Sequence, residues 1–83
     1  MKIRFTKHQV PRGTRADAER NDALLLVKNA SALRLTYQIR LLTFRAIELR
    51  KKLVIEVPKH CTIWPSLNEF QREHSHVIRI QRF

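Results

Sequence analysis

The longest regular pattern of apolar and polar residues in the chain lies between Ser31 and Lys52. Apolar side chains recur there at steps of three and four residues, which places them on one face of a helix. Six residues form this stripe: Leu35, Ile39, Leu42, Ala46, Leu49 and Leu53. The pattern predicts one long helix that turns this stripe toward the protein core.

A strand is the alternative for the first part of the same stretch. From Leu33 to Leu41 apolar residues alternate strictly with polar ones, as they do in a half-buried strand. The alternation changes phase at Leu42 and again at Ile47, whereas the helical stripe continues without interruption. The helix therefore accounts for more of the pattern than a strand does.

Three elements are expected before this helix. Residues 1–5 alternate apolar and basic side chains, which predicts a short strand. Residues 8–14 include a proline and the only glycine of the chain, which indicates a loop. Thr14 and Asp17 have the spacing of a relaxed capping box, so a first helix is predicted from there to about Lys28.

Three more elements are expected after it. Residues 53–57 are apolar on both faces and Pro58 stops the run, so they predict a strand in the middle of a sheet. Ser66, with an acidic residue three positions later, is expected to cap a short helix over residues 67–74. Residues 76–83 predict a last strand.

Together these elements predict a single α+β domain over residues 1–83, in the order β-α-α-β-α-β. The link between the last two strands is roughly 20 residues long and contains a helix, which suits a parallel crossover. The simplest arrangement is a three-stranded sheet with two or three helices packed on one side.

Charge is the strongest functional signal. The chain has 17 Lys and Arg against 7 Asp and Glu, a formal net charge of +10. Such an excess attracts polyanions through long-range electrostatics and counterion release. We therefore expect a nucleic-acid-binding or nucleic-acid-associated protein, with DNA or RNA as its partner. The residues expected to contact phosphate lie on the first strand, the loop and the long helix: Lys2, Arg4, Lys7, Arg12, Arg15, Arg34, Arg40, Arg45, Arg50, Lys51 and Lys52.

A protein-interaction module is the alternative function. Tyr37 and Phe44 give the long helix a second apolar side, opposite the core stripe. This side favours packing against the first helix or a second copy of the chain over base stacking. The chain would then form a homodimer or larger homo-oligomer, or bind an acidic protein partner, as an inhibitor, adaptor or secretion-system accessory does.

Catalytic, metal and cofactor sites are not expected. The chain has no glycine-rich phosphate loop, and His60 next to Cys61 makes no nucleophile–base pair because successive side chains diverge. His74 and His76 add further metal-ligating chemistry, but the spacing matches no tetrahedral site. The protein is therefore expected to be non-enzymatic, without metal or cofactor.

The cysteine content and the lack of a long apolar run indicate where in the cell the protein is expected. A single cysteine cannot form an internal disulfide. The sequence also has no run of about 18 apolar residues that would predict a membrane span. We therefore expect a cytoplasmic protein in a reducing compartment.

Overall fold

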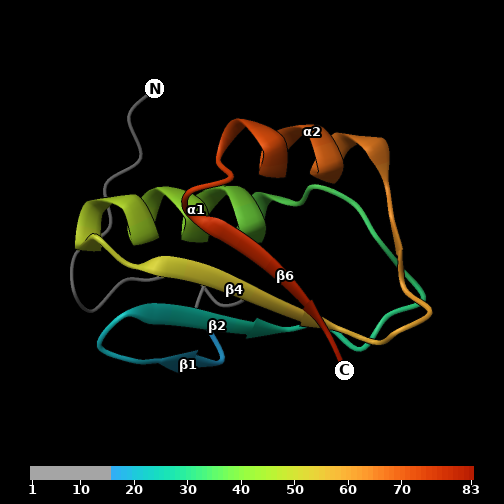
Figure 1. Ribbon diagram of the computed structural model, residues 1–83, viewed down its shortest axis with the longest axis horizontal. Coiled ribbons are helices and arrows are strands. Elements are labelled where there is room, and N and C mark those ends of the chain that lie inside the picture. The colour runs from blue at the N-terminus through green and yellow to red at the C-terminus, as the bar shows by residue number, and fades with distance from the viewer. Residues whose placement is uncertain (1–15) are drawn as a thin grey trace.

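Both helices of the described chain lie on one face of a four-stranded sheet (Figure 1). The computed structural model describes residues 16–83, so the predicted strand over residues 1–5 and the loop over residues 8–14 lie outside it. Eight elements follow one another: β1 (Ala18–Glu19), β2 (Ala23–Val27), β3 (Ala32–Leu33), α1 (Tyr37–Leu49), β4 (Lys52–Val57), β5 (Thr62–Ile63), α2 (Pro65–Glu73) and β6 (Ile78–Arg82).

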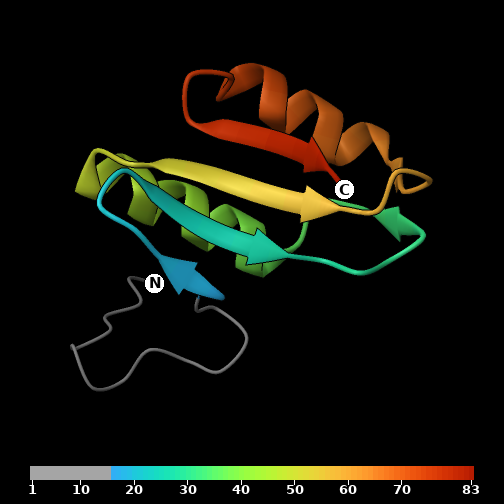
Figure 2. The ribbon, with the colours of Figure 1, turned by 60° about the horizontal axis from the view of Figure 1, so that its bottom comes forward.

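The sheet has the strand order β1-β2-β4-β6 (Figure 2). β1 is antiparallel to β2, whereas β2, β4 and β6 are parallel to one another. α1 connects β2 to β4, and α2 connects β4 to β6. β3 and β5 form a separate two-stranded parallel sheet. None of the helices in the described part of the chain is long and apolar enough to cross a membrane.

The mixed α+β architecture is confirmed, and so are the central position of residues 53–57 and the parallel crossover to the last strand. The three-stranded sheet and the order β-α-α-β-α-β are wrong. Residues 16–83 contain two helices, and a hairpin stands where the first helix was predicted.

That hairpin occupies residues 16–28. The backbone N–H of Arg20 donates to the carbonyl oxygen of Ala23 at 2.7 Å, which leaves Asn21 and Asp22 as a two-residue turn. Both are poor helix formers, because their side chains compete with the backbone for hydrogen bonds. A helix would have had to continue through them.

The apolar run of β2 is buried as a strand. Leu24 and Leu26 face the helices and are almost fully buried. A continuous apolar run suits a buried helix as well as a buried strand, so the pattern alone did not decide between them. Asp17, expected in the first turn of a helix, instead accepts the backbone N–H of Val27 through Oδ2 at 2.6 Å and ties the hairpin together.

Helix α1 confirms the helical interpretation of the central stretch but is shorter than residues 31–52. Thr36 caps its N-terminus, because Oγ1 accepts the N–H of Ile39 at 3.2 Å. Ala32 and Leu33, before the cap, pair as β3 with β5, so of the strand alternative from Leu33 to Leu41 only Leu33 lies in a strand. The buried face of α1 consists of Ile39, Leu42, Thr43 and Ala46. Leu49, also part of the predicted stripe, is 39% exposed, and Leu53, the last residue of the stripe, lies in β4.

Helix α2 begins at Pro65, with Trp64 as its N-cap residue. The prediction that Ser66 caps this helix is wrong. Its Oγ accepts the backbone N–H of Leu35 at 3.2 Å, which links α2 to the segment before α1. Leu67 is fully buried and anchors α2 against the rest of the core.

The register of the parallel strands explains where the core lies. Leu53 of β4 lies between Leu24 and Ile78, and Ile55 lies between Leu26 and Ile80. Residues paired in this way face the same side of a parallel sheet, so they form rows beneath the helices. This arrangement fixes the relative positions of three chain segments that meet at one end of the sheet: the end of α1, the start of β4 and the turn before β6.

Candidate anion-binding site

Helix α1 ends in a left-handed residue that is not glycine. Arg50 has φ 57° and ψ 44°. Its N–H donates to the carbonyl of Ile47 at 3.1 Å, and the N–H of Lys51 donates to that of Ala46 at 2.8 Å. This is the Schellman arrangement, in which glycine is the usual left-handed residue. A residue with a Cβ costs about 1–2 kcal/mol in this conformation.

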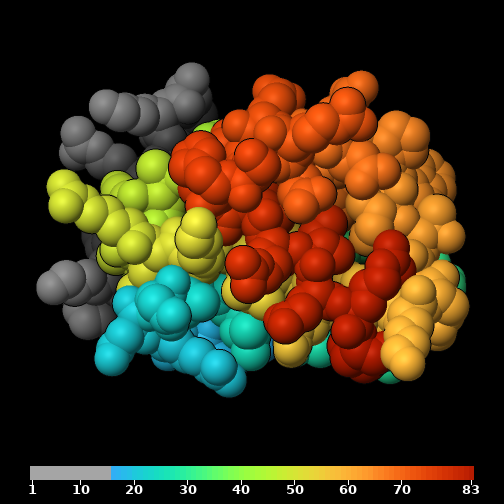
Figure 3. All heavy atoms as spheres, in the orientation of Figure 1, coloured from blue at the N-terminus to red at the C-terminus, as the bar shows by residue number. Residues whose placement is uncertain are grey.

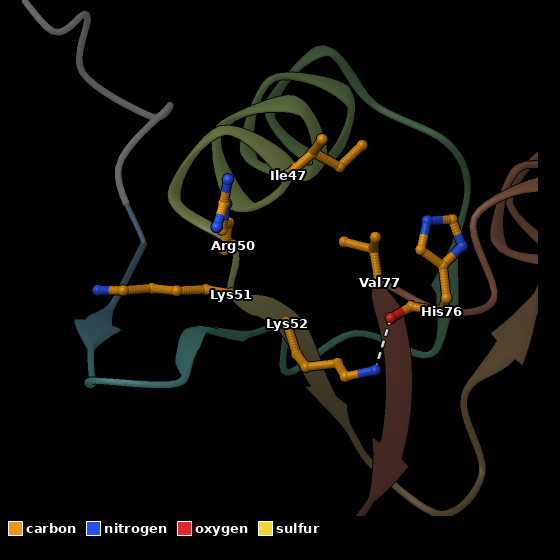
Figure 4. A pocket seen from close by; sticks show the side chains of 6 residues that line it. All are labelled: Ile47, Arg50, Lys51, Lys52, His76 and Val77. Carbon is orange, nitrogen blue, oxygen red and sulfur yellow. Dashed lines mark hydrogen bonds between the residues drawn. The ribbon is translucent and has the colours of Figure 1, made fainter.

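A pocket of about 240 Å³ opens between the end of α1 and the start of β6 (Figure 4). Six residues line it: Ile47, Arg50, Lys51, Lys52, His76 and Val77. In the space-filling view the yellow end of α1 and start of β4 adjoin the red segment before β6 on one face (Figure 3). The lining therefore combines three successive basic residues with a histidine and two apolar side chains.

Lys51 is directed away from this pocket, toward β1 (Figure 4). Its Nζ lies 2.9 Å from Oε2 of Glu19. The hydrogen bond from Lys51 and its charge lower the pKa of the Glu19 carboxyl, with a further small contribution from the charge of Arg45. Lys51 is thus already neutralised by an acidic partner, and Arg45 lies close to the same pair.

Lys52 and Arg50 differ from Lys51 in their partners. Lys52 Nζ donates to the carbonyl oxygen of His76 at 2.6 Å, which joins the start of β4 to the turn before β6. The Arg50 guanidinium makes no hydrogen bond or ion pair with any residue in the range 16–83. Two cations without an acidic partner among the described residues therefore line the same pocket.

The predicted phosphate-contacting residues are only partly brought together. Arg45, Arg50, Lys51 and Lys52 gather where α1 ends. Arg34 and Arg40 are exposed toward the other end of this helix. Five further predicted residues lie outside the described part of the chain: Lys2, Arg4, Lys7, Arg12 and Arg15.

The net charge is divided unevenly along the chain. Residues 16–83 contain 12 of the 17 Lys and Arg and all seven Asp and Glu, which leaves a formal charge of +5 there. The first 15 residues contain the other five basic residues and no acidic one. Half of the excess charge thus belongs to less than a fifth of the sequence.

Sequence reasoning did not include His76 and Val77 in the site. Their place follows from the pairing of β4 with β6, in which Leu53 lies opposite Ile78. The residues just before each of these two strands must then lie side by side. The sequence signal for this proximity is the predicted parallel crossover, which places the turn before the last strand beside Lys52.

The second apolar side of α1 partly packs against α2. The ring of Phe44 stands edge-on to Phe70 and His74, with centroid distances of 6.4 and 6.1 Å. Phe70 and His74 lie 4.4 Å apart and tilted. Packing was the expected role of this side, although against the first predicted helix or a second copy of the chain. Tyr37 and Phe44 each remain 53% exposed.

The four residues with metal-ligating chemistry are dispersed. Cys61 is buried, His60 is exposed, and His74 contacts aromatic rings. His76 lines the basic pocket. Residues 16–83 contain no group of three or more His, Cys, Asp or Glu side chains placed to hold a metal ion.

The sheet face opposite the helices is a second exposed feature. Leu25 and Val54 are half-buried side by side there, and Val27 is 42% exposed. Glu56 and Arg79 lie on the same face. This surface is more apolar than the end of α1 and carries charges of both signs.

The chain matches no family model, and no curated protein or solved structure matches it. The function must therefore be inferred from the geometry and charge of the chain itself.

Proposed function

We propose that this chain is a non-enzymatic nucleic-acid-associated protein that contacts phosphate groups through the basic end of α1. One observation carries the proposal: Arg50 and Lys52 line a single pocket with no acidic partner among the described residues. An arginine fork and a lysine ammonium are the side chains that proteins use most to bind phosphate.

The distribution of charge supports the same proposal. The described residues have a formal charge of +5, and the first 15 residues add the same amount. A net positive charge of this size accelerates association with a polyanion and makes affinity strongly dependent on salt. The pocket supplies what net charge alone lacks, namely a defined place for a phosphate.

The test is a titration of fluorescent single- and double-stranded DNA and RNA at a series of salt concentrations. Binding should weaken steeply with salt, and Arg50→Glu should reduce the slope of log K against log salt by about 1, since one phosphate contact is lost. Lys59→Glu is the matched control, because it changes the charge equally at the opposite end of β4.

Two results would reject the proposal. The first is a lack of affinity for any of these nucleic acids at low salt. The second is an equal loss of affinity in Arg50→Glu and Lys59→Glu, which would assign binding to net charge and not to the end of α1.

A protein-interaction module remains the second candidate, because Val27 is exposed on the helix-free sheet face and Leu25 and Val54 are only half-buried there. Sedimentation equilibrium separates the two candidates. A stable oligomer without nucleic-acid affinity, dissociated by Val54→Lys, would favour self-association through this face over phosphate binding.

A further inference from the structure

We infer that the pocket at the end of α1 is a binding site for one phosphate group, held by Arg50 and Lys52. This inference rests on the proposed function and deepens it, because it names the chemical group that is bound and the residues that hold it.

Arg50 has a left-handed backbone conformation that its place at the helix end does not by itself explain. Glycine is the residue that fits a left-handed helix end without steric cost, and Lys51 and Lys52 already place positive charge at this helix end. Neither helix termination nor the helix dipole therefore requires an arginine at position 50. A strained residue at the edge of a pocket points to a use for its side chain.

Arg50 and Lys52 have hydrogen-bond donors that no described residue uses. The Arg50 guanidinium has five N–H donors, and none of them is bonded to a described residue. Lys52 donates one of its three protons to the carbonyl of His76, so two more remain. His76 lines the same pocket and fixes the position of Lys52 through its carbonyl oxygen.

The groups around these donors, carbonyl oxygens and apolar side chains, also affect how well an anion would bind. Two of the last carbonyl oxygens of α1, those of Ala46 and Ile47, already accept backbone hydrogen bonds, so they repel an anion less than free carbonyls at a helix C-terminus would. Ile47 and Val77 also line the pocket, Val77 buried and Ile47 43% exposed. Apolar neighbours of this kind strengthen charge-assisted hydrogen bonds.

The size of the pocket limits the ligand. Its volume of about 240 Å³ is below the roughly 300–1,000 Å³ of sites that enclose a whole small molecule. The pocket suits one compact group, while the rest of the ligand stays outside. A tetrahedral phosphate has enough oxygens to accept from the arginine fork and the lysine ammonium together.

The test is NMR titration of the full chain with inorganic phosphate at constant ionic strength. Shifts should concentrate on Ile47, Arg50, His76 and Val77. Arg50→Gly should weaken phosphate binding by about tenfold or more, as expected for lost charge-assisted hydrogen bonds. The same variant should raise the melting temperature, because glycine relieves the left-handed strain. If Arg50 had only a structural role, Arg50→Gly would not weaken phosphate binding and raise the melting temperature at the same time.

A second arm identifies the source of the phosphate. Oligonucleotides with and without a 5′-phosphate are compared on the unmodified chain and on Arg50→Gly. If Arg50→Gly loses affinity only for the 5′-phosphorylated oligonucleotide, the ligand is a terminal phosphate. If it loses affinity equally for both oligonucleotides, the ligand is an internal phosphodiester.

Three outcomes would overturn the inference. In the first, the chemical-shift changes that phosphate causes are equally large at distant cationic residues such as Lys59. In the second, Arg50→Gly leaves phosphate affinity unchanged. In the third, inorganic phosphate does not bind at the pocket, although oligonucleotides still bind with a steep salt dependence; the proposed function then survives and the pocket assignment does not.

Discussion

The ammonium group of Lys51 lies 2.9 Å from the carboxylate of Glu19 and so joins the end of α1 to the β1–β2 hairpin. Three basic residues follow one another at this helix end, yet their side chains differ in what they contact. Lys51 pairs with an acid, Lys52 with a carbonyl oxygen, and Arg50 with no described residue. Arg50 and Lys52 are therefore left without an acidic partner among the described residues.

The Glu19–Lys51 pair predicts a pH dependence. Lys51 lowers the pKa of the folded Glu19 carboxyl below its ordinary value of 4.5. The pair therefore stabilises the fold at pH values above the unfolded pKa, and this contribution is lost as the pH falls through the lower folded pKa. Carboxyl NMR titration should show the low pKa, and Lys51→Gln should raise it.

Arg45→Gln is the matched comparison for this titration. Arg45 is the smallest of the influences on the Glu19 carboxyl, so its substitution should raise the pKa less than Lys51→Gln does. An unchanged pKa in Lys51→Gln would show that the ion pair does not form in solution.

Two leucines of α1 predict contrasting stabilities. Leu42 is 1% exposed and Leu49 is 39% exposed, although the sequence placed both on the core stripe. Leu42→Ala should lower the free energy of unfolding by about 2–5 kcal/mol, because it leaves a cavity in the core. Leu49→Ala should cost less than about 1 kcal/mol. Urea denaturation measures both, and equal losses would contradict the orientation of α1.

Thr43 is a fully buried polar residue whose hydroxyl donates to the carbonyl of Ile39 at 2.7 Å. That carbonyl also accepts the regular helical hydrogen bond, so Thr43→Val leaves no acceptor unpaired. The free energy of unfolding should then change by less than about 1 kcal/mol. Thr43→Ser keeps the hydroxyl but removes a buried methyl group, and should cost about 1 kcal/mol. A larger loss of unfolding free energy in Thr43→Val than in Thr43→Ser would show that the hydroxyl contributes more to stability than the packing of the methyl group.

The sequence predicted the second half of the fold better than the first. α1, β4, α2 and β6 each follow from a clear local pattern, such as the β-branched run that ends at Pro58. β2 could not be distinguished from a buried helix, because its five residues are all apolar and carry no period. Its strand state depends on pairing with β4, which lies about 30 residues later by the register of Ala23 with Lys52.

The candidate site was predictable only in part for the same reason. Residue type identified Arg50 and Lys52 as basic candidates, but it could not show that Glu19 neutralises Lys51. That pairing depends on the hairpin, which the helix prediction for residues 16–28 excluded. The left-handed backbone of Arg50 was also not apparent, since arginine carries no turn signal.

The position of β4 has a consequence for how the chain folds. Its two neighbours in the sheet, β2 and β6, lie on either side of it in sequence. During synthesis the backbone of β4 therefore keeps one unpaired edge until residues 78–82 have left the ribosome, and an exposed apolar strand invites association with other chains. The formation of β6 thus completes the protection of the central strand.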